Sequence, residues 1–315
     1  MNIVFIIGSI IVYLFSSILS SFEINPFYRM YYLFAWYSYI FFVDGVIYSI
    51  KKQSLIISQI QEFIYMLFVS SGMWFVFEIF NISLKNWSYI MLPFDNQIRY
   101  FGYIASYATV LPAIFETTQL IETIGIFKKI PKIKTKIVVN PNKIIYIGTL
   151  LTLFTIIFPK YLFPFIWVSP LLITEGFNLK LQTRSLIREL NAGNIRKIFD
   201  LSLAGLVCGF LWEFFNYKAG AKWIYHLPYL NTPKIFEMPI WGYIGFSFFA
   251  LECYSFYNLL SYFKNGITWE EDARIPINQK NPKYFYFFLF IAILIITIIS
   301  IKLIDKYTVK SFTIF

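Results

Sequence analysis

The sequence predicts an all-α polytopic membrane protein with about nine transmembrane helices. Of its 315 residues, 58% are hydrophobic and only 14% are charged, whereas about 25% of the residues in a soluble domain are charged. Apolar runs of about 17–25 residues recur along the chain, and each is long enough to cross a hydrocarbon core. Because these runs are continuous, they favour helices over the alternating strands of a membrane barrel.

Four apolar runs before residue 128 each predict one transmembrane helix. The first run has neither a basic segment before it nor a small-residue cleavage site after it, so we expect a retained helix rather than a signal peptide. Asn25 and Pro26 predict a turn between the first two helices, and Lys51 and Lys52 end the second. The four predicted helices span residues 3–20, 31–50, 63–81 and 100–121.

A basic stretch broken by prolines, residues 128–143, predicts the main boundary in the chain. Two short helices are expected after it, separated at Pro159, and Pro164 and Pro170 are expected to kink the second. A charged loop is expected to precede the last helix. The helices predicted in this part span residues 144–159, 161–179, 200–217, 239–262 and 284–303.

The two parts of the chain resemble each other, which predicts an internal duplication. The matched pairs, at offsets of 131 to 140 residues, are Trp36/Trp167, Asp44/Glu175, Glu78/Glu213, Asn81/Asn216, Trp87/Trp223, Tyr89/Tyr225, Gly102/Gly242 and Glu116/Glu252. Four helices return a chain to its starting side, so the two units are expected to be parallel and related by a pseudo-two-fold axis along the membrane normal. We therefore expect a first four-helix repeat at 1–127, a basic linker at 128–143, a second four-helix repeat at 144–265, and a charged loop with a C-terminal transmembrane helix at 266–315.

The net charge of +10 is explained by membrane topology rather than by a nucleic-acid partner. Seventeen of the 27 lysines and arginines fall in the loops that the helix count places on one side of the membrane. Because basic loops face the cytoplasm, we expect a cytoplasmic N-terminus, an external C-terminus and a location in the plasma (inner) membrane.

Six acids fall inside predicted helices as three matched pairs, with no lysine or arginine in the same spans: Asp44/Glu175, Glu78/Glu213 and Glu116/Glu252. An ionisable group at that depth costs several kcal/mol, which makes each of them a functional candidate. A neutral carboxylic acid held in an apolar cavity is a proton donor. The alternative interpretation is a hydrogen bond between helices, or an acid that reaches the membrane interface from a helix end.

Aromatic and amide side chains accompany these acids. Glu213 and Asn216 share a helix face, so we expect the amide to orient the carboxyl. Aromatic rings near a proton donor stabilise a carbocation, although interfacial aromatics are the alternative interpretation. The loops after the third and seventh predicted helices are expected to form a lid. The predicted catalytic residues are Glu213, Glu252, Asn216, Glu78 and Glu116, and the predicted substrate-binding residues are Trp212, Trp223, Tyr225, Trp87, Tyr89, Asp44 and Glu175.

Several sites of known chemistry are absent from the sequence. It contains no phosphate-binding glycine loop, no HExxH zinc motif and no GxSxG nucleophile motif. With one histidine in the chain, paired-haem and desaturase-type di-iron clusters are excluded. Cys208 and Cys253 lie in apolar runs and carry no disulfide or zinc signal. We therefore expect no metal and no cofactor.

An acid, then Trp-x-Tyr, then proline, then an acid among phenylalanines occurs from Glu213 to Tyr225 and from Pro239 to Glu252, with counterparts between Glu78 and Glu116. This order resembles the small membrane lycopene cyclases of the heterodimeric or fused type. The resemblance implies related halves and a cofactor-free, acid-catalysed cyclisation or isomerisation of a polyene lipid within the bilayer. Here a single acid follows Pro239 at some distance, where that family has paired acids close behind the proline.

Three functions are compatible with these features. The first is a membrane isomerase, cyclase or hydratase that acts on an isoprenoid or carotenoid-like lipid, with Glu213 and Glu252 as acid and base. The second is a proton- or cation-coupled transporter or channel with acids at the repeat interface. The third is a scaffold or assembly subunit of a membrane complex, in which the acids only join helices. The partner expected for the first is a membrane lipid or isoprenoid substrate.

Overall fold

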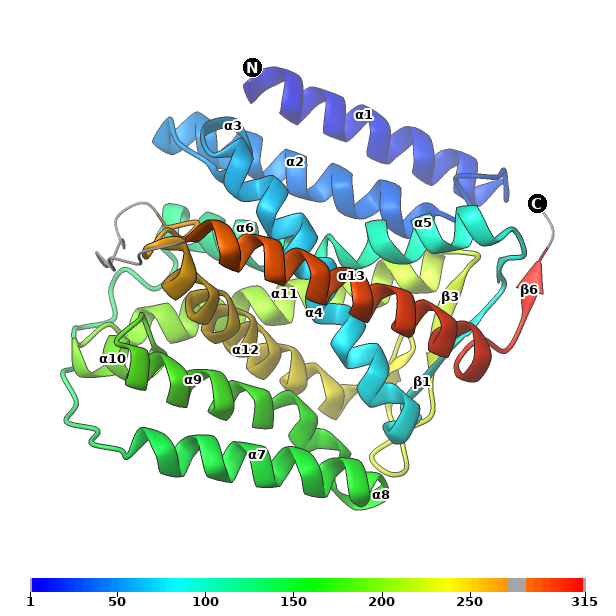
Figure 1. Ribbon diagram of the computed structural model, residues 1–315. Helices are drawn as coiled ribbons and strands as arrows, with labels where there is room; N and C mark the ends of the chain where they lie inside the picture. Colours follow the sequence, from blue (N-terminus) through cyan, green and yellow to red (C-terminus); the bar gives the residue numbers. More distant parts are fainter. Residues whose placement is uncertain (1, 271–281, 314–315) are drawn as a thin grey trace.

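The structure, a computed structural model, describes residues 2–270 and 282–313. It is mostly helical, and most of the long helices run in roughly the same direction (Figure 1). Most of the charged loop expected before the last helix lies outside the described residues. Among the described helices, five are long and apolar enough to cross a membrane: α1 (Asn2–Ser21), α2 (Tyr31–Lys51), α4 (Ile60–Leu84), α11 (Ile195–Lys218) and α13 (Pro282–Tyr307). These helices agree with the predicted class of helical membrane protein.

Shorter helices connect or accompany the five long ones. Those of the first half are α3 (Leu55–Ser58), α5 (Asn96–Tyr107) and α6 (Val110–Ile124). Those of the second half are α7 (Pro141–Ile157), α8 (Pro159–Leu162), η1 (Phe163–Trp167), α9 (Ser169–Leu181), α10 (Leu186–Asn191), η2 (Ile240–Gly242), α12 (Tyr243–Ser261) and η3 (Tyr262–Lys264).

Two helices predicted as continuous are broken. The span expected at 100–121 ends as α5 at Tyr107 and resumes as α6, because Pro112 has no N–H for the carbonyl of Ala108 and its ring clashes with that carbonyl. The span expected at 161–179 divides into α8, η1 and α9, with Pro164 and Pro170 in the first turns of the last two. At Phe158 the chain bends by 119° between α7 and the segment after it.

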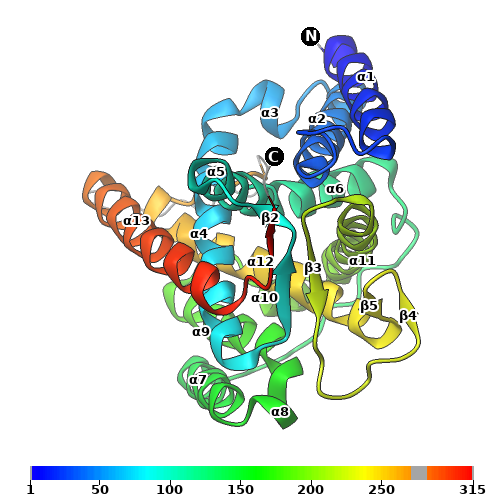
Figure 2. The same cartoon turned by 90° about the vertical axis from the view of Figure 1, so that its right-hand side faces the viewer.

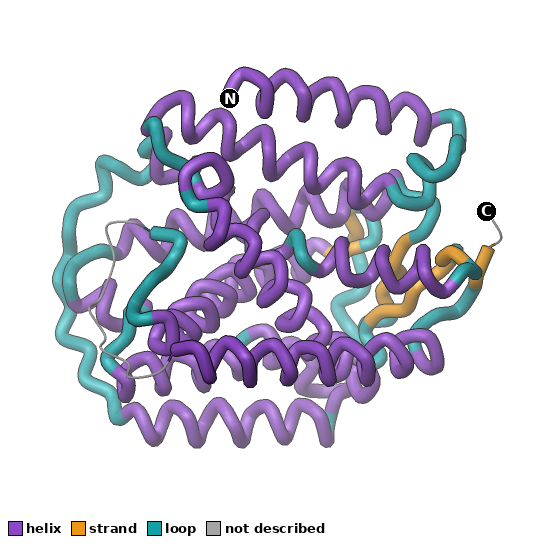
Figure 3. Tube along the Cα trace, turned by 45° about the horizontal axis from the view of Figure 1, so that its top comes forward, coloured by secondary structure: helices purple, strands orange, loops and turns teal. Residues whose placement is uncertain are grey.

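The prediction of an all-α protein missed six short strands in the described residues. They are β1 (Trp87–Ile90), β2 (Leu92–Pro93), β3 (Lys222–Tyr225), β4 (Lys234–Ile235), β5 (Met238–Pro239) and β6 (Phe312–Thr313). Strands β1 and β3 pair antiparallel, β2 and β6 pair parallel, and β4 and β5 pair antiparallel. All of them lie near one end of the long helices (Figures 2 and 3). The pairing of β1 with β3 joins loops that are far apart in the sequence.

Helices of the two halves pack in corresponding ways. Helix α1 lies along α2, as α7 lies along α9, and both α6 and α12 pack against the second member of their pair. In both helix pairs, a glycine allows the close approach. A Cβ added at Gly45 on α2 would lie 2.9 Å from Ile6 on α1, and one added at Gly176 on α9 would lie 2.5 Å from Ile145 on α7. Helix α13 packs against α4.

The core joins the two halves through aromatic rings. Trp36 is fully buried, and its ring centroid lies 5.5 Å from that of Trp212 and 5.3 Å from that of Phe215. Phe77 stacks on Trp167 at 5.3 Å. Offset and edge-to-face ring pairs add about 0.5–1.5 kcal/mol each beyond the burial of their surface. This packing holds α4 and α11, which carry the central acids, in fixed positions.

Candidate functional site

A cavity of about 680 Å³ lies at the strand-bearing end of the molecule, between the two halves. Strands β1 and β3, helices α5, α11 and α12 and the turn η1 all contribute side chains to its wall. Six residues predicted for the site line it: Trp212, Glu213, Trp223, Tyr225, Trp87 and Tyr89. The other six predicted residues do not line it: Glu252, Asn216, Glu78, Glu116, Asp44 and Glu175.

Reciprocal pairing of β1 and β3 builds one wall of this cavity. Trp87 pairs with Tyr225, and Tyr89 pairs with Trp223, on either side of the central pair between Ser88 and Ile224. Each tryptophan thus lies opposite the tyrosine of the other strand. The loops expected to form a lid therefore meet as a two-stranded sheet rather than as independent flaps.

Glu78, on α4, is held by three donors on one oxygen. Its Oε1 accepts the Trp74 indole N–H at 3.0 Å, the Trp87 indole N–H at 3.2 Å and the Tyr89 hydroxyl at 2.6 Å. All three donors line the cavity, and so they separate Glu78 from it. The Tyr89 oxygen also lies 3.0 Å from the Tyr107 hydroxyl oxygen. Glu78 Oε2 has no hydrogen-bond partner among the described residues.

Glu213, on α11, has far fewer partners than its counterpart Glu78. Its Oε1 accepts only the Tyr225 hydroxyl, at 2.8 Å. Its Oε2 and the indole nitrogens of Trp212 and Trp223 have no hydrogen-bond partner among the described residues. Glu213 lines the cavity although the residue is fully buried. It is the residue best placed to exchange a proton with a molecule in the cavity.

The tyrosines of the two strands keep their protons. Burial, and then the adjacent Glu213 carboxyl, raise the pKa of the Tyr225 phenol well above its usual range. Burial and then Glu78 do the same to the pKa of Tyr89. Each phenol is therefore a hydrogen-bond donor to its carboxyl and not a competing acid.

Asn216 does not orient Glu213, in contrast to the sequence-based expectation. Its side chain donates to the Trp223 carbonyl at 2.9 Å and accepts the Trp223 N–H at 2.9 Å. In the first half, Asn81 makes the same pair of bonds to Trp87, at 2.9 and 3.2 Å. A shared helix face brings an amide near a carboxyl but does not decide its partner. Both amides instead fix the turn that leads from a helix into its strand.

Asp44 and Glu175 hold short helices against the bundle. Asp44 accepts the Ile56 N–H at 2.6 Å and the Ser54 hydroxyl at 3.0 Å, next to α3. Glu175 accepts the N–H groups of the first two residues of α10 and a serine hydroxyl on α12. The first N–H groups of a helix have no partner within the helix, so each carboxyl satisfies groups that burial would otherwise leave unpaired.

Glu116 and Glu252 are buried within the bundle. Glu116 lies within electrostatic reach of Asp44, but neither of its carboxyl oxygens makes a hydrogen bond of normal geometry in the described chain. Glu252 Oε2 is likewise without a partner there. These two acids therefore lie buried between helices, apart from the cavity lining.

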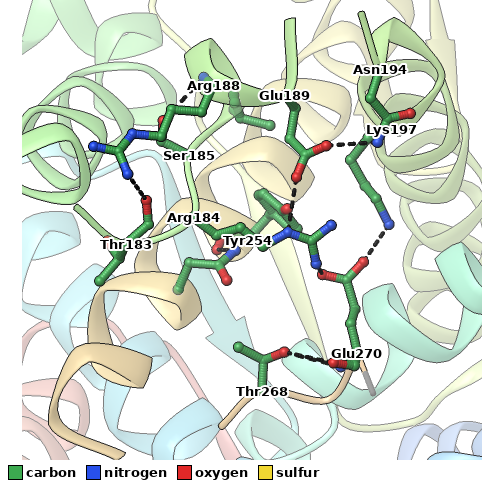
Figure 4. Close-up of polar contacts among 12 residues, drawn as sticks. Thr183, Arg184, Ser185, Arg188, Glu189, Asn194, Lys197, Tyr254, Thr268 and Glu270 are labelled. Carbon is green, nitrogen blue, oxygen red and sulfur yellow. Dashed lines mark hydrogen bonds and ion pairs between the residues drawn. The ribbon is translucent and has the colours of Figure 1, made fainter. Parts of the chain in front are cut away.

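A charged cluster at the opposite end of the bundle was not predicted (Figure 4). Arg184 bonds Glu189 at 2.8 Å and also pairs with Glu270, which in turn pairs with Lys197. Lys197 also pairs with Glu122. The sequence-based interpretation used Arg184 and Lys197 only as markers of the cytoplasmic side. Each charge in this group has an opposite partner, so the cluster ties α6, α10, α11 and the segment after η3 together at this end of the bundle.

No metal centre is apparent in the described part of the chain, where no three His, Cys, Asp or Glu side chains come together. Cys208 and Cys253 are buried free thiols. The single histidine, His226, has its Nε2 2.7 Å from the Ser88 hydroxyl oxygen, a contact that links the two strand loops. The cavity lining therefore offers a carboxyl, phenols and indoles, together with the cationic groups of Arg29, Arg99 and Lys222.

Comparison with protein-family models, with curated proteins and with solved structures found no match to this chain. The cavity, the one carboxyl in its described lining and the aromatic groups around it are the features that bear on function.

Proposed function

We propose that this protein is a membrane-embedded, acid-catalysed isomerase or cyclase, or a hydratase, that acts on an isoprenoid or carotenoid-like lipid. The observation that carries the proposal is the position of Glu213. It is the only acid in the described lining of a cavity whose other walls are mostly apolar and aromatic. A cavity of this kind takes an apolar ligand, and a buried carboxylic acid is the group that protonates an alkene.

The residues on the cavity wall have complementary roles in this chemistry. Glu213 donates its proton to one carbon of a double bond, whose π electrons form the new C–H bond and leave a carbocation. Tyr225 donates a hydrogen bond to Glu213 Oε1 and stabilises the carboxylate that remains. The faces of Trp212 and Trp223 stabilise the cation. In an isomerase or cyclase, loss of a proton from a neighbouring carbon to the carboxylate restores Glu213. In a hydratase, a water molecule adds to the cation and gives up a proton to the carboxylate. Neither route needs an oxidant or reductant.

An apolar rim gives a lipid substrate its route into the cavity. Trp241 and Ile244 both line the cavity with 54% of their surface exposed. Phe165 and Phe248, on η1 and α12, are also exposed parts of the lining. An opening bordered by exposed apolar side chains faces hydrocarbon at lower cost than it faces water. The substrate therefore enters sideways from the bilayer.

We also propose the finer architecture expected from the sequence: nine spans, two parallel four-helix repeats and a C-terminal helix. The reciprocal pairs of β1 and β3 support it, because a two-fold rotation through the pair of Ser88 and Ile224 exchanges them. The matched bonds of Asn81 and Asn216 support it as well. The segments after α2, α6 and α9 lie at the end opposite the strands (Figure 1), in accord with a cytoplasmic N-terminus and an external C-terminus.

A proton- or cation-coupled transporter is the second candidate. Neither carboxyl oxygen of Glu116 makes a hydrogen bond of normal geometry within the described residues, and the group lies near Asp44, which is an arrangement suited to holding a proton in the bilayer. In proteoliposomes, a transporter would carry protons or cations and lose that flux in Glu116→Gln. If no cation shows flux and the protein converts a lipid, the transporter is excluded and the enzyme is supported.

The first prediction concerns Glu213. In cells supplied with isoprenoid lipids, the Glu213→Gln variant is expected to form no product, because an amide cannot donate the proton that the alkene requires. Lipid extracts are compared by chromatography and mass spectrometry. The matched control is Glu23→Gln, the same change at an exposed acid, which is expected to retain full conversion. Equal product from both variants at equal expression would remove Glu213 from the mechanism.

A further inference from the structure

A second hollow lies on the exposed side of the first two helices. It is a groove of about 580 Å³ between α1, α2 and α5. Its rim is exposed and apolar: Val4 is 70% exposed and Phe101 is 61% exposed. No acidic or basic residue belongs to its described lining. A surface of this composition accepts hydrocarbon and offers nothing to a charged ligand.

The groove and the cavity share a wall. Met30 and Leu33 belong to the lining of both. Leu33 is largely buried, and Met30 is partly exposed. Methionine is unbranched and changes rotamer at little cost. A change of the Met30 rotamer can therefore open a passage for a hydrocarbon chain between Met30 and Leu33. Two side chains therefore separate the groove from the cavity.

The groove contains empty space at a defined point on α1. A Cβ added at Gly8 would meet no atom within 4 Å. Gly45, on the neighbouring α2, is the opposite case, since a Cβ there would lie 2.9 Å from Ile6. The two helices thus pack closely at Gly45 and leave open space beside Gly8. A larger residue at position 8 can fill this space without disturbing the helix contact.

Three polar side chains belong to the described lining of the groove: Ser9, Tyr37 and Ser38. The Tyr37 hydroxyl donates to the Ala105 carbonyl at 3.1 Å, which ties α2 to α5. The Ser38 hydroxyl is 95% buried and has no hydrogen-bond partner among the described residues. One small hydroxyl does not create a polar site. The floor is suited to an apolar chain.

We propose that this groove binds the distal hydrocarbon segment of the lipid whose reactive segment occupies the cavity. The chain passes between Met30 and Leu33 and then lies along α1 beside Gly8. The ligand is accordingly a long, linear, unsaturated hydrocarbon chain, longer than the cavity alone can hold. The unsaturation of the ligand and the nature of the reaction rest on the proposed function above, but the binding of a hydrocarbon chain in the groove does not.

The test uses two photoreactive isoprenoid probes with a diazirine at the chain end, one of triterpene length and one of monoterpene length. Each is added to the purified protein in lipid nanodiscs and crosslinked, and the labelled peptides are identified by mass spectrometry. The long probe is expected to label α1 around residues 4–12, and the short probe is expected to label only cavity residues. In Gly8→Phe, labelling of α1 by the long probe is expected to fall about tenfold, which corresponds to about 1.4 kcal/mol of binding.

Two further variants make the result decisive. Val12→Phe, on the rim of the same groove, is expected to act like Gly8→Phe. Ile11→Phe, on the same helix but outside the groove lining and 59% exposed, is expected to leave labelling unchanged. Labelling of the cavity by the short probe in every variant shows that the protein is folded.

Two outcomes separate the proposals. If labelling of α1 persists in both groove variants, or falls equally in Ile11→Phe, the groove holds only surrounding membrane lipid and the inference is wrong. If the groove variants lose the label but the unaltered protein converts no isoprenoid, the groove site stands and the proposed reaction fails.

Discussion

At the scale of single residues, the two central acids differ in the number of donors that reach them. Glu78 receives three hydrogen bonds on one oxygen, whereas Glu213 receives one. A buried carboxyl with several donors is structurally anchored. A carboxyl with one donor and an open oxygen retains the capacity to bond a ligand. The asymmetry is the reason that Glu213, and not Glu78, is assigned the proton transfer.

This difference predicts unequal effects of the same substitution. Tyr89→Phe leaves Glu78 with two indole donors, but Tyr225→Phe leaves Glu213 with no donor in the described chain. Loss of the last partner of a buried group costs about 1–3 kcal/mol. We expect Tyr225→Phe to destabilise the protein by about that amount and Tyr89→Phe to cost less. Thermal unfolding in detergent measures both, and a larger loss for Tyr89→Phe would contradict the assignment.

At the scale of elements, the C-terminal segment holds β1 and β2 in place. The Tyr89 N–H donates to the Thr308 carbonyl at 2.9 Å, and the Lys310 N–H donates to the Tyr89 carbonyl at 2.7 Å. Asp305, on α13, binds Arg99 at 2.6 Å and accepts the Tyr103 hydroxyl at 3.0 Å. The last helix, expected as a plain addition to two repeats, thus fixes the strand that carries a cavity residue.

Truncation tests this role of the C-terminal segment. A chain that ends at Tyr307 loses the backbone bonds to β1 and β2, so the amides of residues 89–94 are expected to exchange hydrogen faster. Hydrogen–deuterium exchange followed by mass spectrometry measures the effect. A chain that ends at Thr313 keeps β6 and is the control, with exchange like that of the full chain. Unchanged protection after the longer truncation would mean that β1 is held by β3 alone.

At the scale of the whole molecule, the two halves meet at the strand pair and in the aromatic core, so the cavity belongs to neither half alone. Its wall takes Trp87 and Tyr89 from the first half, and Glu213 and Tyr225 from the second. At the other end, Arg184 and Lys197 both form ion pairs with Glu270. The two ends of the bundle therefore differ: the candidate site lies at the end with the strands, and the ion-pair cluster lies at the other.

A designed disulfide tests whether the pairing of β1 with β3 joins the two halves. Ser88 and Ile224 are directly opposed in the strand pair, and cysteines at opposed positions of antiparallel strands lie within bonding distance. After cleavage at a protease site placed in the linker 128–143, Ser88→Cys with Ile224→Cys is expected to keep the halves joined on a non-reducing gel. Ser88→Cys with Lys222→Cys, two positions out of register, is the control and is expected to separate. Separation of both pairs would contradict this register.

Local sequence features accounted for part of the site. The matched Trp-x-Tyr segments after two helices led to Trp87, Tyr89, Trp223 and Tyr225, which do line the cavity. The role of Asn216 was mistaken because helical spacing gives neighbours on one face but not the donor or acceptor that another segment supplies. Glu270 escaped notice because its partners lie more than 70 residues earlier in the chain.

The sequence by itself determined the class of protein and the approximate position of its long helices. Each apolar residue contributes separately to the free energy of transfer from water into the membrane, so the length of an apolar run is sufficient to predict a span. Only the tertiary structure decided which acids are anchored, which one lines the cavity, and how the strands and the C-terminal segment meet. Hydrogen bonds are short and directional, so these outcomes depend on the final positions of segments that are distant in sequence.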